Sequence, residues 1–282
     1  MSPEDATLPS AANQAIEVLA SQLDNDRTSR TRRITEKFLV AALGSIPWVG
    51  GFMAAAADIK GDEADVKADD LRTQWLREHQ KKLDELAKTL QHIIDRFASI
   101  GAEVDERIQT PEYLALVRQA FRAWDNAETD AKRTFVVNLV ANCAGTRVCS
   151  DDVVRLFISW LSIYHEAHFA VIRELHQNPG STRFDIWAAI YGELPREDSA
   201  EADLYRMLIR DLSTGGVLRQ ARDTTEAGEF LRRRPQRRRG PAPSTMESSF
   251  EDSKPYVLTE LGKQFVHYTL MGDIRRMEAS RG

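Results

Sequence analysis

The chain has 282 residues, and 38 Lys and Arg against 43 Asp and Glu give a formal net charge of −5. This length allows one or two domains with a buried core. A hydrophobic fraction of 42% excludes a chain disordered throughout and a multi-span membrane protein. Two cysteines exclude a disulfide-bonded scaffold and are typical of a reducing compartment, so we expect a cytoplasmic protein.

Charge is distributed unevenly over the first 70 residues. Residues 1–26 carry a net charge of −5 and are expected to form an acidic, partly flexible arm. Residues 27–37 carry +4, the 20 residues 38–57 carry no charge, and residues 58–70 carry −4. The uncharged stretch has the length of a membrane span, and its basic flank would keep the N-terminal side in the cytoplasm.

Gly44, Pro47, Gly50 and Gly51 interrupt this stretch. Because Pro47 removes a helix donor, the pattern predicts an apolar helical hairpin with its turn at 44–51. Three interpretations stay open: a buried helix-turn-helix, a hairpin that inserts into an anionic membrane only on activation, and a single constitutive span. The residues that would carry membrane activity are Phe38, Leu39, Ile46, Pro47, Trp48, Gly50, Gly51 and Phe52.

A heptad pattern predicts one long amphipathic helix over residues 62–100. One apolar row recurs every seven residues from Leu76 to Phe97, and a second runs from Leu86 to Ile100. Such a seam belongs either to an intramolecular bundle or to a homo-oligomer. Further helices are predicted from Thr110-Pro111 onward, over 128–144, and from Ser150 to Leu175, so residues 27–164 are expected to form an α-helical bundle.

From residue 165 onward the pattern changes to short helices and strands. Ser181 is predicted to cap a second helix, residues 200–213 form a third, and strands are expected at 217–221 and 256–258, before a final helix capped by Thr259. The segment YVLTELGKQF resembles the strand-to-helix ending of bacterial winged-helix domains. This resemblance implies a winged helix-turn-helix, α+β domain over residues 165–282 in a protein that is otherwise mainly α.

In DNA-binding winged-helix domains the third helix enters the major groove. The resemblance therefore makes residues 200–213 a candidate recognition helix, with Tyr205, Arg206 and Arg210 as the reading residues. Residues 200–213 together carry a net charge of −1, whereas a groove-reading helix presents a basic surface to phosphates. The module is expected to bind a protein partner or nucleic acid, and the charge favours protein.

A long insert, 222–255, separates the two predicted strands. We expect it to be disordered, because its length far exceeds that of ordinary hairpin loops. An arginine tract within it predicts contact with a polyanion, whether nucleic acid, acidic lipid or acidic protein, unless the insert is idle. The tract consists of Arg232, Arg233, Arg234, Arg237, Arg238 and Arg239.

The sequence contains no catalytic or nucleotide-binding signature. Cys143 and Cys149 are expected to be free thiols. His165 and His168 are three residues apart, whereas the metalloprotease helix needs four, so they are expected to be an ordinary surface or core pair. We expect no cofactor, no metal and no enzymatic activity.

The overall layout resembles helical bacterial proteins of phage-defence and conflict systems, with a basic stretch, an apolar hairpin around IPWVGG, a long helix and a terminal winged helix. The resemblance implies a non-enzymatic effector or adaptor, whose hairpin acts on a membrane when the bundle opens. The alternative is a soluble dimeric winged-helix DNA-binding regulator. An enzyme whose residues assemble only in three dimensions is a third hypothesis.

Overall fold

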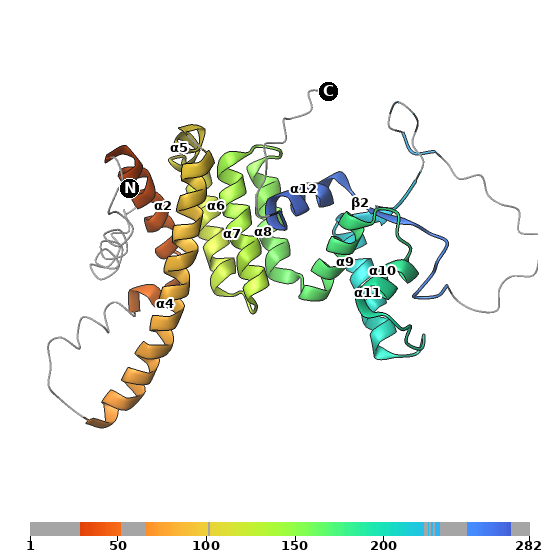
Figure 1. Ribbon diagram of the computed structural model, residues 1–282, viewed down its shortest axis with the longest axis horizontal. Coiled ribbons are helices and arrows are strands. Elements are labelled where there is room, and N and C mark those ends of the chain that lie inside the picture. The colour runs from red at the N-terminus through yellow and green to blue at the C-terminus, as the bar shows by residue number, and fades with distance from the viewer. Residues whose placement is uncertain are drawn as a thin grey trace, which may run out of the picture. The chain divides into compact units, whose positions relative to one another are not determined.

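The computed structural model describes residues 29–51, 66–100, 102–222 and 247–271, together with 225, 227 and 229–231. The prediction of a mainly α-helical chain is confirmed. The described residues divide into two compact units with the boundary between Ile163 and Tyr164 (Figure 1), and Met271 groups with the first. We call them the N-terminal unit and the C-terminal unit.

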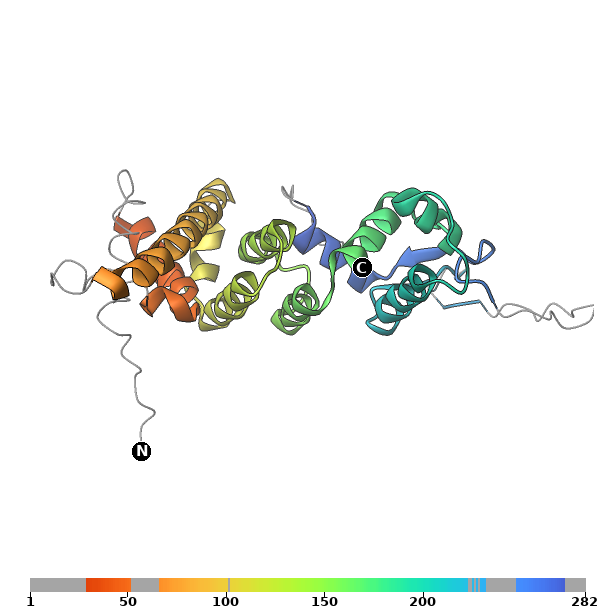
Figure 2. The same ribbon diagram turned by 90° about the horizontal axis from the view of Figure 1, so that it is seen from below.

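The N-terminal unit is entirely helical over its described residues. α6 packs against α2, α7 and α8, and α4 packs against α7. Figure 2 shows α6, α7 and α8 nearly end-on, as three adjacent helices. The elements are α2 (Ser29–Leu43), α4 (Val66–Ile100), α5 (Ala102–Ile108), α6 (Pro111–Asp125), α7 (Asp130–Gly145) and α8 (Asp151–Ile163).

The described part of the uncharged stretch belongs to the core of this unit. α2 ends at Leu43, the chain turns over residues 44–46, and helix resumes at Pro47, so the turn is shorter than predicted. Phe38 and Leu39 are completely buried, and the Phe38 ring meets the rings of Phe97 and Phe121 edge-on at 5.2 and 6.1 Å. This arrangement corresponds to the buried helix-turn-helix interpretation.

Among the residues that the structure describes, no helix combines the length and hydropathy needed to cross a membrane.

The predicted long helix is present from Val66 onward, and residues 62–65 lie outside the described residues. Leu86, Leu90 and Ile93 of the heptad rows are completely buried. Since α4 packs against α7, the central part of the seam is used within the unit.

Prediction of a single helix from Ser150 to Leu175 is wrong. α8 ends at Ile163, and α9 (Glu166–Gln177) begins after a break. His165 has extended backbone, and its N–H donates a 3.2 Å hydrogen bond to Nδ1 of His168. The two histidines therefore start a helix, because the His168 side chain satisfies an N–H that has no partner within the helix.

The C-terminal unit has the order helix, helix, helix, strand, strand, helix. α9 packs against α10, α11, α12 and β2. The two predicted strands pair antiparallel, with Leu218 opposite Leu258 and Gln220 opposite Tyr256. The remaining elements are α10 (Arg183–Tyr191), α11 (Ala200–Thr214), β1 (Leu218–Gln220), β2 (Tyr256–Leu258) and α12 (Glu260–Thr269).

Local capping explains two of these helix starts. Thr182, rather than the predicted Ser181, caps α10, and it shares a capping box with Asp185. Thr259 caps α12 as predicted: its Oγ1 accepts a 2.9 Å hydrogen bond from the Gly262 N–H and donates one of 2.6 Å to the Gly216 carbonyl. A Cβ on Gly262 would lie 2.1 Å from the Val217 carbonyl oxygen, so the T-x-x-G spacing fits the close approach of α12 to the start of β1.

Candidate partner-docking site

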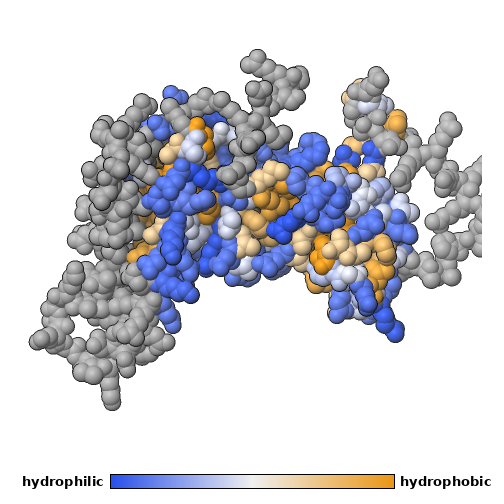
Figure 3. All heavy atoms as spheres, in the orientation of Figure 1, coloured by the Kyte–Doolittle hydropathy of each residue, from blue (hydrophilic) through white to orange (hydrophobic). Residues whose placement is uncertain are grey.

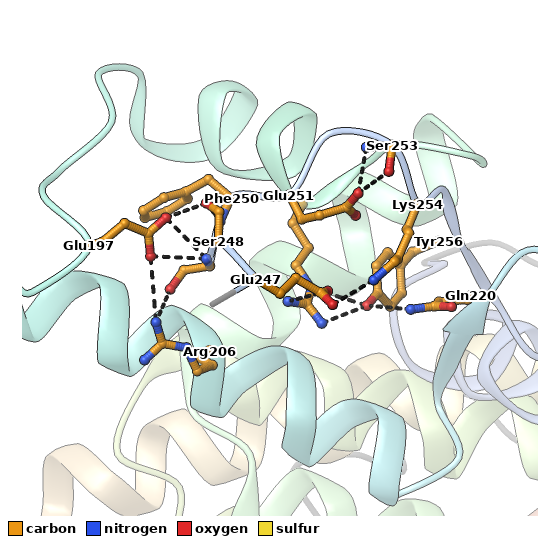
Figure 4. A network of polar contacts seen from close by, with 12 residues as sticks. Glu197, Arg206, Gln220, Glu247, Ser248, Phe250, Glu251, Ser253, Lys254 and Tyr256 are labelled. Carbon is orange, nitrogen blue, oxygen red and sulfur yellow. Dashed lines mark hydrogen bonds and ion pairs between the residues drawn. The ribbon is translucent and has the colours of Figure 1, made fainter. Parts of the chain in front are cut away.

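Residues Glu247–Lys254, which we call the strap, lie against α10 and α11 (Figure 4). Ser249 is completely buried and Phe250 is 7% exposed. These residues belong to the insert 222–255, which the sequence predicts to be disordered. That prediction is corrected for the strap, because its apolar and polar side chains both have partners on the helices.

The Phe250 ring lies in an aromatic slot formed by Trp187 of α10 and Tyr205 of α11. It stacks on Tyr205 with ring centroids 5.6 Å apart and planes 7° apart, and it meets Trp187 edge-on at 5.2 Å. Such pairs add to the free energy gained by removing the ring from water. Burial raises the pKa of Tyr205, so its hydroxyl stays protonated and donates a 2.7 Å hydrogen bond to the Arg183 carbonyl.

Beside the slot, Glu197 receives two donors from the strap (Figure 4). The Ser248 hydroxyl and the Ser249 backbone N–H both donate to its carboxylate, the latter at 3.0 Å. Arg206 lies 3.5 Å from the same carboxylate and donates a 2.5 Å hydrogen bond to Oγ of Ser249. Desolvation opposes ionisation of Glu197, but these hydrogen bonds and the Arg206 charge outweigh it, so its pKa is lowered.

A second group of polar side chains lies at the ends of the strap and consists of Glu247, Lys254, Arg183 and Tyr256. Glu247 lies 3.7 Å from the Arg183 guanidinium and accepts a 2.6 Å hydrogen bond from Lys254. Arg183 also donates from Nε and Nη2 to the Tyr256 hydroxyl, at 3.1 and 2.9 Å. The strap therefore contacts α10, α11 and Glu197 between them, and Arg183 links the same site to Tyr256 of the small sheet.

The three predicted DNA-reading residues occupy different environments. Tyr205 is completely buried and belongs to the core. Arg206 is bound by Asp203, Glu197 and the strap. Arg210 is exposed and lies 3.6 Å from Asp211. α11 thus offers Arg210 as the one predicted reading residue that is exposed and not bound to the strap.

The surface around α10 and α11 carries exposed apolar side chains. Phe184, Tyr191, Leu194 and Leu204 are each between 40 and 49% exposed. Figure 3 shows apolar atoms among hydrophilic ones over this face of the C-terminal unit. A group of exposed apolar side chains surrounded by polar ones is a candidate site for contact with another protein.

Other predicted site residues are divided between the core and the surface of the N-terminal unit. Ile46 is buried like Phe38 and Leu39, Trp48 is half-buried, and Pro47 and Gly51 are exposed. Gly50 has an open surrounding, since nothing lies within 4 Å of a Cβ added there. Phe52 and the whole arginine tract, Arg232–Arg239, lie outside the described residues.

A cavity of about 430 Å³ lies between α4, α6 and α7 of the N-terminal unit. Arg133 borders it, with its guanidinium 5.2 Å from the Trp124 ring and 3.2 Å from the Glu85 carboxylate. The indole Nε1 of Trp124 and Nε of Arg133 are buried without an acceptor among the described residues. The residues that line this cavity are Glu85, Lys88, Thr89, His92, Trp124, Asp130, Arg133, Thr134, Val137 and Asn138.

Neither cysteine forms a disulfide: Cys143 is buried and Cys149 is half-buried. Burial raises the pKa of the Cys143 thiol. No group of three or more His, Cys, Asp and Glu side chains in the described part of the chain is placed to hold a metal ion.

No pattern in the sequence indicates Glu197, Trp187 or the strap as site residues. The insert contains two aromatic residues, Phe230 and Phe250, and only the structure shows that Phe250 is buried while Phe230 is 50% exposed. The chain matches no protein-family model, no curated protein and no solved structure.

Proposed function

We propose that this chain is a non-enzymatic effector or adaptor whose C-terminal unit is a winged-helix module that docks a protein partner. The observation that carries the proposal is the composition of the surface at α10 and α11. It exposes four large apolar side chains, while α11 itself carries Glu201, Asp203 and Asp211 against Arg206 and Arg210. The winged-helix assignment itself rests on the resemblance of residues 256–265, YVLTELGKQF, to the strand-to-helix ending of such domains.

The same surface disfavours the alternative, a winged-helix regulator that reads DNA. Contact with phosphates requires uncompensated cations, but Arg206 lies 2.8 Å from Asp203, and Arg210 lies 3.6 Å from Asp211. In this proposal any contact with a polyanion comes from the arginine tract, Arg232–Arg239, and not from α11.

The N-terminal hairpin would contribute a conditional membrane activity, as in the phage-defence effectors that the layout resembles. Phe38 and Leu39 are completely buried, and exposing one such side chain costs about 1.5–3 kcal/mol. Release of the hairpin therefore requires a trigger, and partner binding to the C-terminal unit is the trigger we propose.

Site-specific photo-crosslinking in the source cells tests the docking function. A photoreactive amino acid replaces Leu204 on α11, and the matched control replaces Leu156, an exposed apolar residue of α8. We expect a discrete protein adduct from position 204 and none from position 156. An adduct that disappears on nuclease treatment would favour the DNA regulator, and equal labelling from both positions would contradict a specific docking surface.

A further inference from the structure

We propose that the aromatic slot, with Glu197 and Arg206 beside it, recognises a short peptide segment, and that the strap occupies this site as a displaceable ligand from the same chain. This inference rests on the proposed docking function and names the chemistry of the partner. The partner is a segment with an acidic residue three positions before an aromatic residue, and with hydrogen-bond donors between them.

Each feature of that segment corresponds to a contact made by the strap, and Figure 4 shows the polar contacts among them. The aromatic ring corresponds to Phe250, which fills the slot between Tyr205 and Trp187. The donors correspond to the Ser248 hydroxyl and the Ser249 N–H, which both reach the Glu197 carboxylate. The acidic residue corresponds to Glu247, which lies 3.7 Å from Arg183.

The site is suited to exchange, because few of the strap contacts are well buried. The ion pairs of Glu247 with Arg183 and Lys254 are partly solvated, with the Glu247 side chain 47% exposed, and such pairs hold a segment weakly. Ser249 and Phe250 are the two buried residues of the strap. One ring and one buried serine therefore supply most of the attachment, and a partner with the same two features competes directly.

Displacement would also change the surface that the partner meets. Arg206 loses the Ser249 hydroxyl as an acceptor and Arg183 loses the Glu247 carboxylate. Both guanidiniums remain next to the slot: Arg206 keeps Asp203 and Arg183 keeps the Tyr256 hydroxyl, and each has N–H groups free to bind a further acceptor. The vacated site consequently selects acidic, hydroxyl-bearing segments over neutral aromatic ones.

The test uses the full-length chain with Phe250→Ala and the fluorescent peptide Glu-Ser-Ser-Phe-Glu-Asp-Ser-Lys, which copies the strap. We expect saturable binding to the variant by fluorescence anisotropy and at least tenfold weaker binding to the wild type, where the strap competes intramolecularly. The matched control peptide has Ala in place of Phe, and its binding should be at least tenfold weaker. Adding Glu197→Gln to the variant should also weaken binding, because a neutral amide oxygen accepts the two donors of the peptide less strongly than the charged carboxylate.

Phe250→Leu is the second variant, since it keeps an apolar side chain in the slot if Phe250→Ala does not fold. A folded variant that does not bind the peptide, or that binds the Ala peptide equally, overturns the inference. Peptide binding without any adduct in the photo-crosslinking experiment leaves the slot established and contradicts the docking function. The reverse result, an adduct at position 204 without peptide binding, contradicts only the slot.

Discussion

Nε1 of Trp48 donates a 2.7 Å hydrogen bond to the carboxylate of Asp125, which joins the apolar hairpin to the end of α6 across 77 positions of sequence. Phe38 and Leu39 of the same segment are held by apolar packing, which has no directional preference. This bond fixes the position of the segment that follows Pro47. It is therefore the contact whose loss should free the hairpin with least damage to the core.

Trp48→Phe tests this relationship. The aromatic side chain remains, but the donor is lost, and we expect the free energy of unfolding to fall by about 1 kcal/mol. Urea unfolding followed by circular dichroism measures the change. Asp125→Asn is the control, because the amide oxygen still accepts the bond and the loss should be smaller. Equal stability of Trp48→Phe and the wild type would show that the bond does not hold the hairpin.

Gly51 allows the membrane hypothesis to be tested without disturbing the fold. It is exposed, and nothing lies within 4 Å of a Cβ added there. We expect Gly51→Glu to keep the wild-type melting temperature and to abolish dye leakage from anionic liposomes, since a charge within the uncharged stretch opposes insertion. Gly51→Gln is the uncharged control and should leak like the wild type. If neither the heated wild type nor the Trp48→Phe variant releases dye, the hairpin is only a core element.

Gly262→Ala should destabilise the C-terminal unit strongly. The new Cβ would lie 2.1 Å from the Val217 carbonyl oxygen, and a backbone atom cannot move aside as a side chain can. We expect a loss of about 1–3 kcal/mol, measured by urea unfolding followed by circular dichroism. Gly50→Ala, at an open position, should change stability by less than about 0.5 kcal/mol. A wild-type melting curve for Gly262→Ala would refute the steric explanation of the T-x-x-G spacing.

What the sequence predicted correctly depends on short-range signals. Thr110 caps α6 with Pro111 in the first turn, and Thr259 caps α12, because a cap is decided by residues three positions apart. The break at His165 was missed since the apolar pattern of α8 continues through it into α9. The strap was missed because its contact with Glu197 joins residues 51 positions apart, and no local pattern encodes that pairing.

The two cysteines should differ in reactivity. Burial raises the pKa of Cys143, so little thiolate is present and reagents cannot reach it, whereas Cys149 is half-buried. At pH 8 we expect Ellman's reagent to modify one thiol in the folded protein and both in guanidinium chloride. Cys149→Ser should remove the modification in the folded state. Modification of that variant without denaturant would indicate that α7 opens locally.

His267 gives the C-terminal unit a pH dependence whose sign follows from burial. Desolvation lowers its pKa below the ordinary value of 6.5, so the unfolded chain binds the proton more readily than the folded one. Stability should be constant above about pH 7.5, fall as the pH drops below 6.5, and level off once the folded state is also protonated. The carboxyl groups with lowered pKa, such as Glu197, act below 4.5, in a separate range. Urea unfolding at pH 7.5 and 5.5, followed by circular dichroism, measures the effect.

His267→Gln should reduce the difference in stability between pH 7.5 and 5.5, because the glutamine side chain has no proton to bind. His176→Gln is the matched control, since His176 is exposed at the end of α9 and its replacement should leave the difference unchanged. If both variants keep the wild-type difference, the pH dependence comes from groups other than His267. If the wild type becomes more stable at pH 5.5, the proposed effect of burial on His267 has the wrong sign.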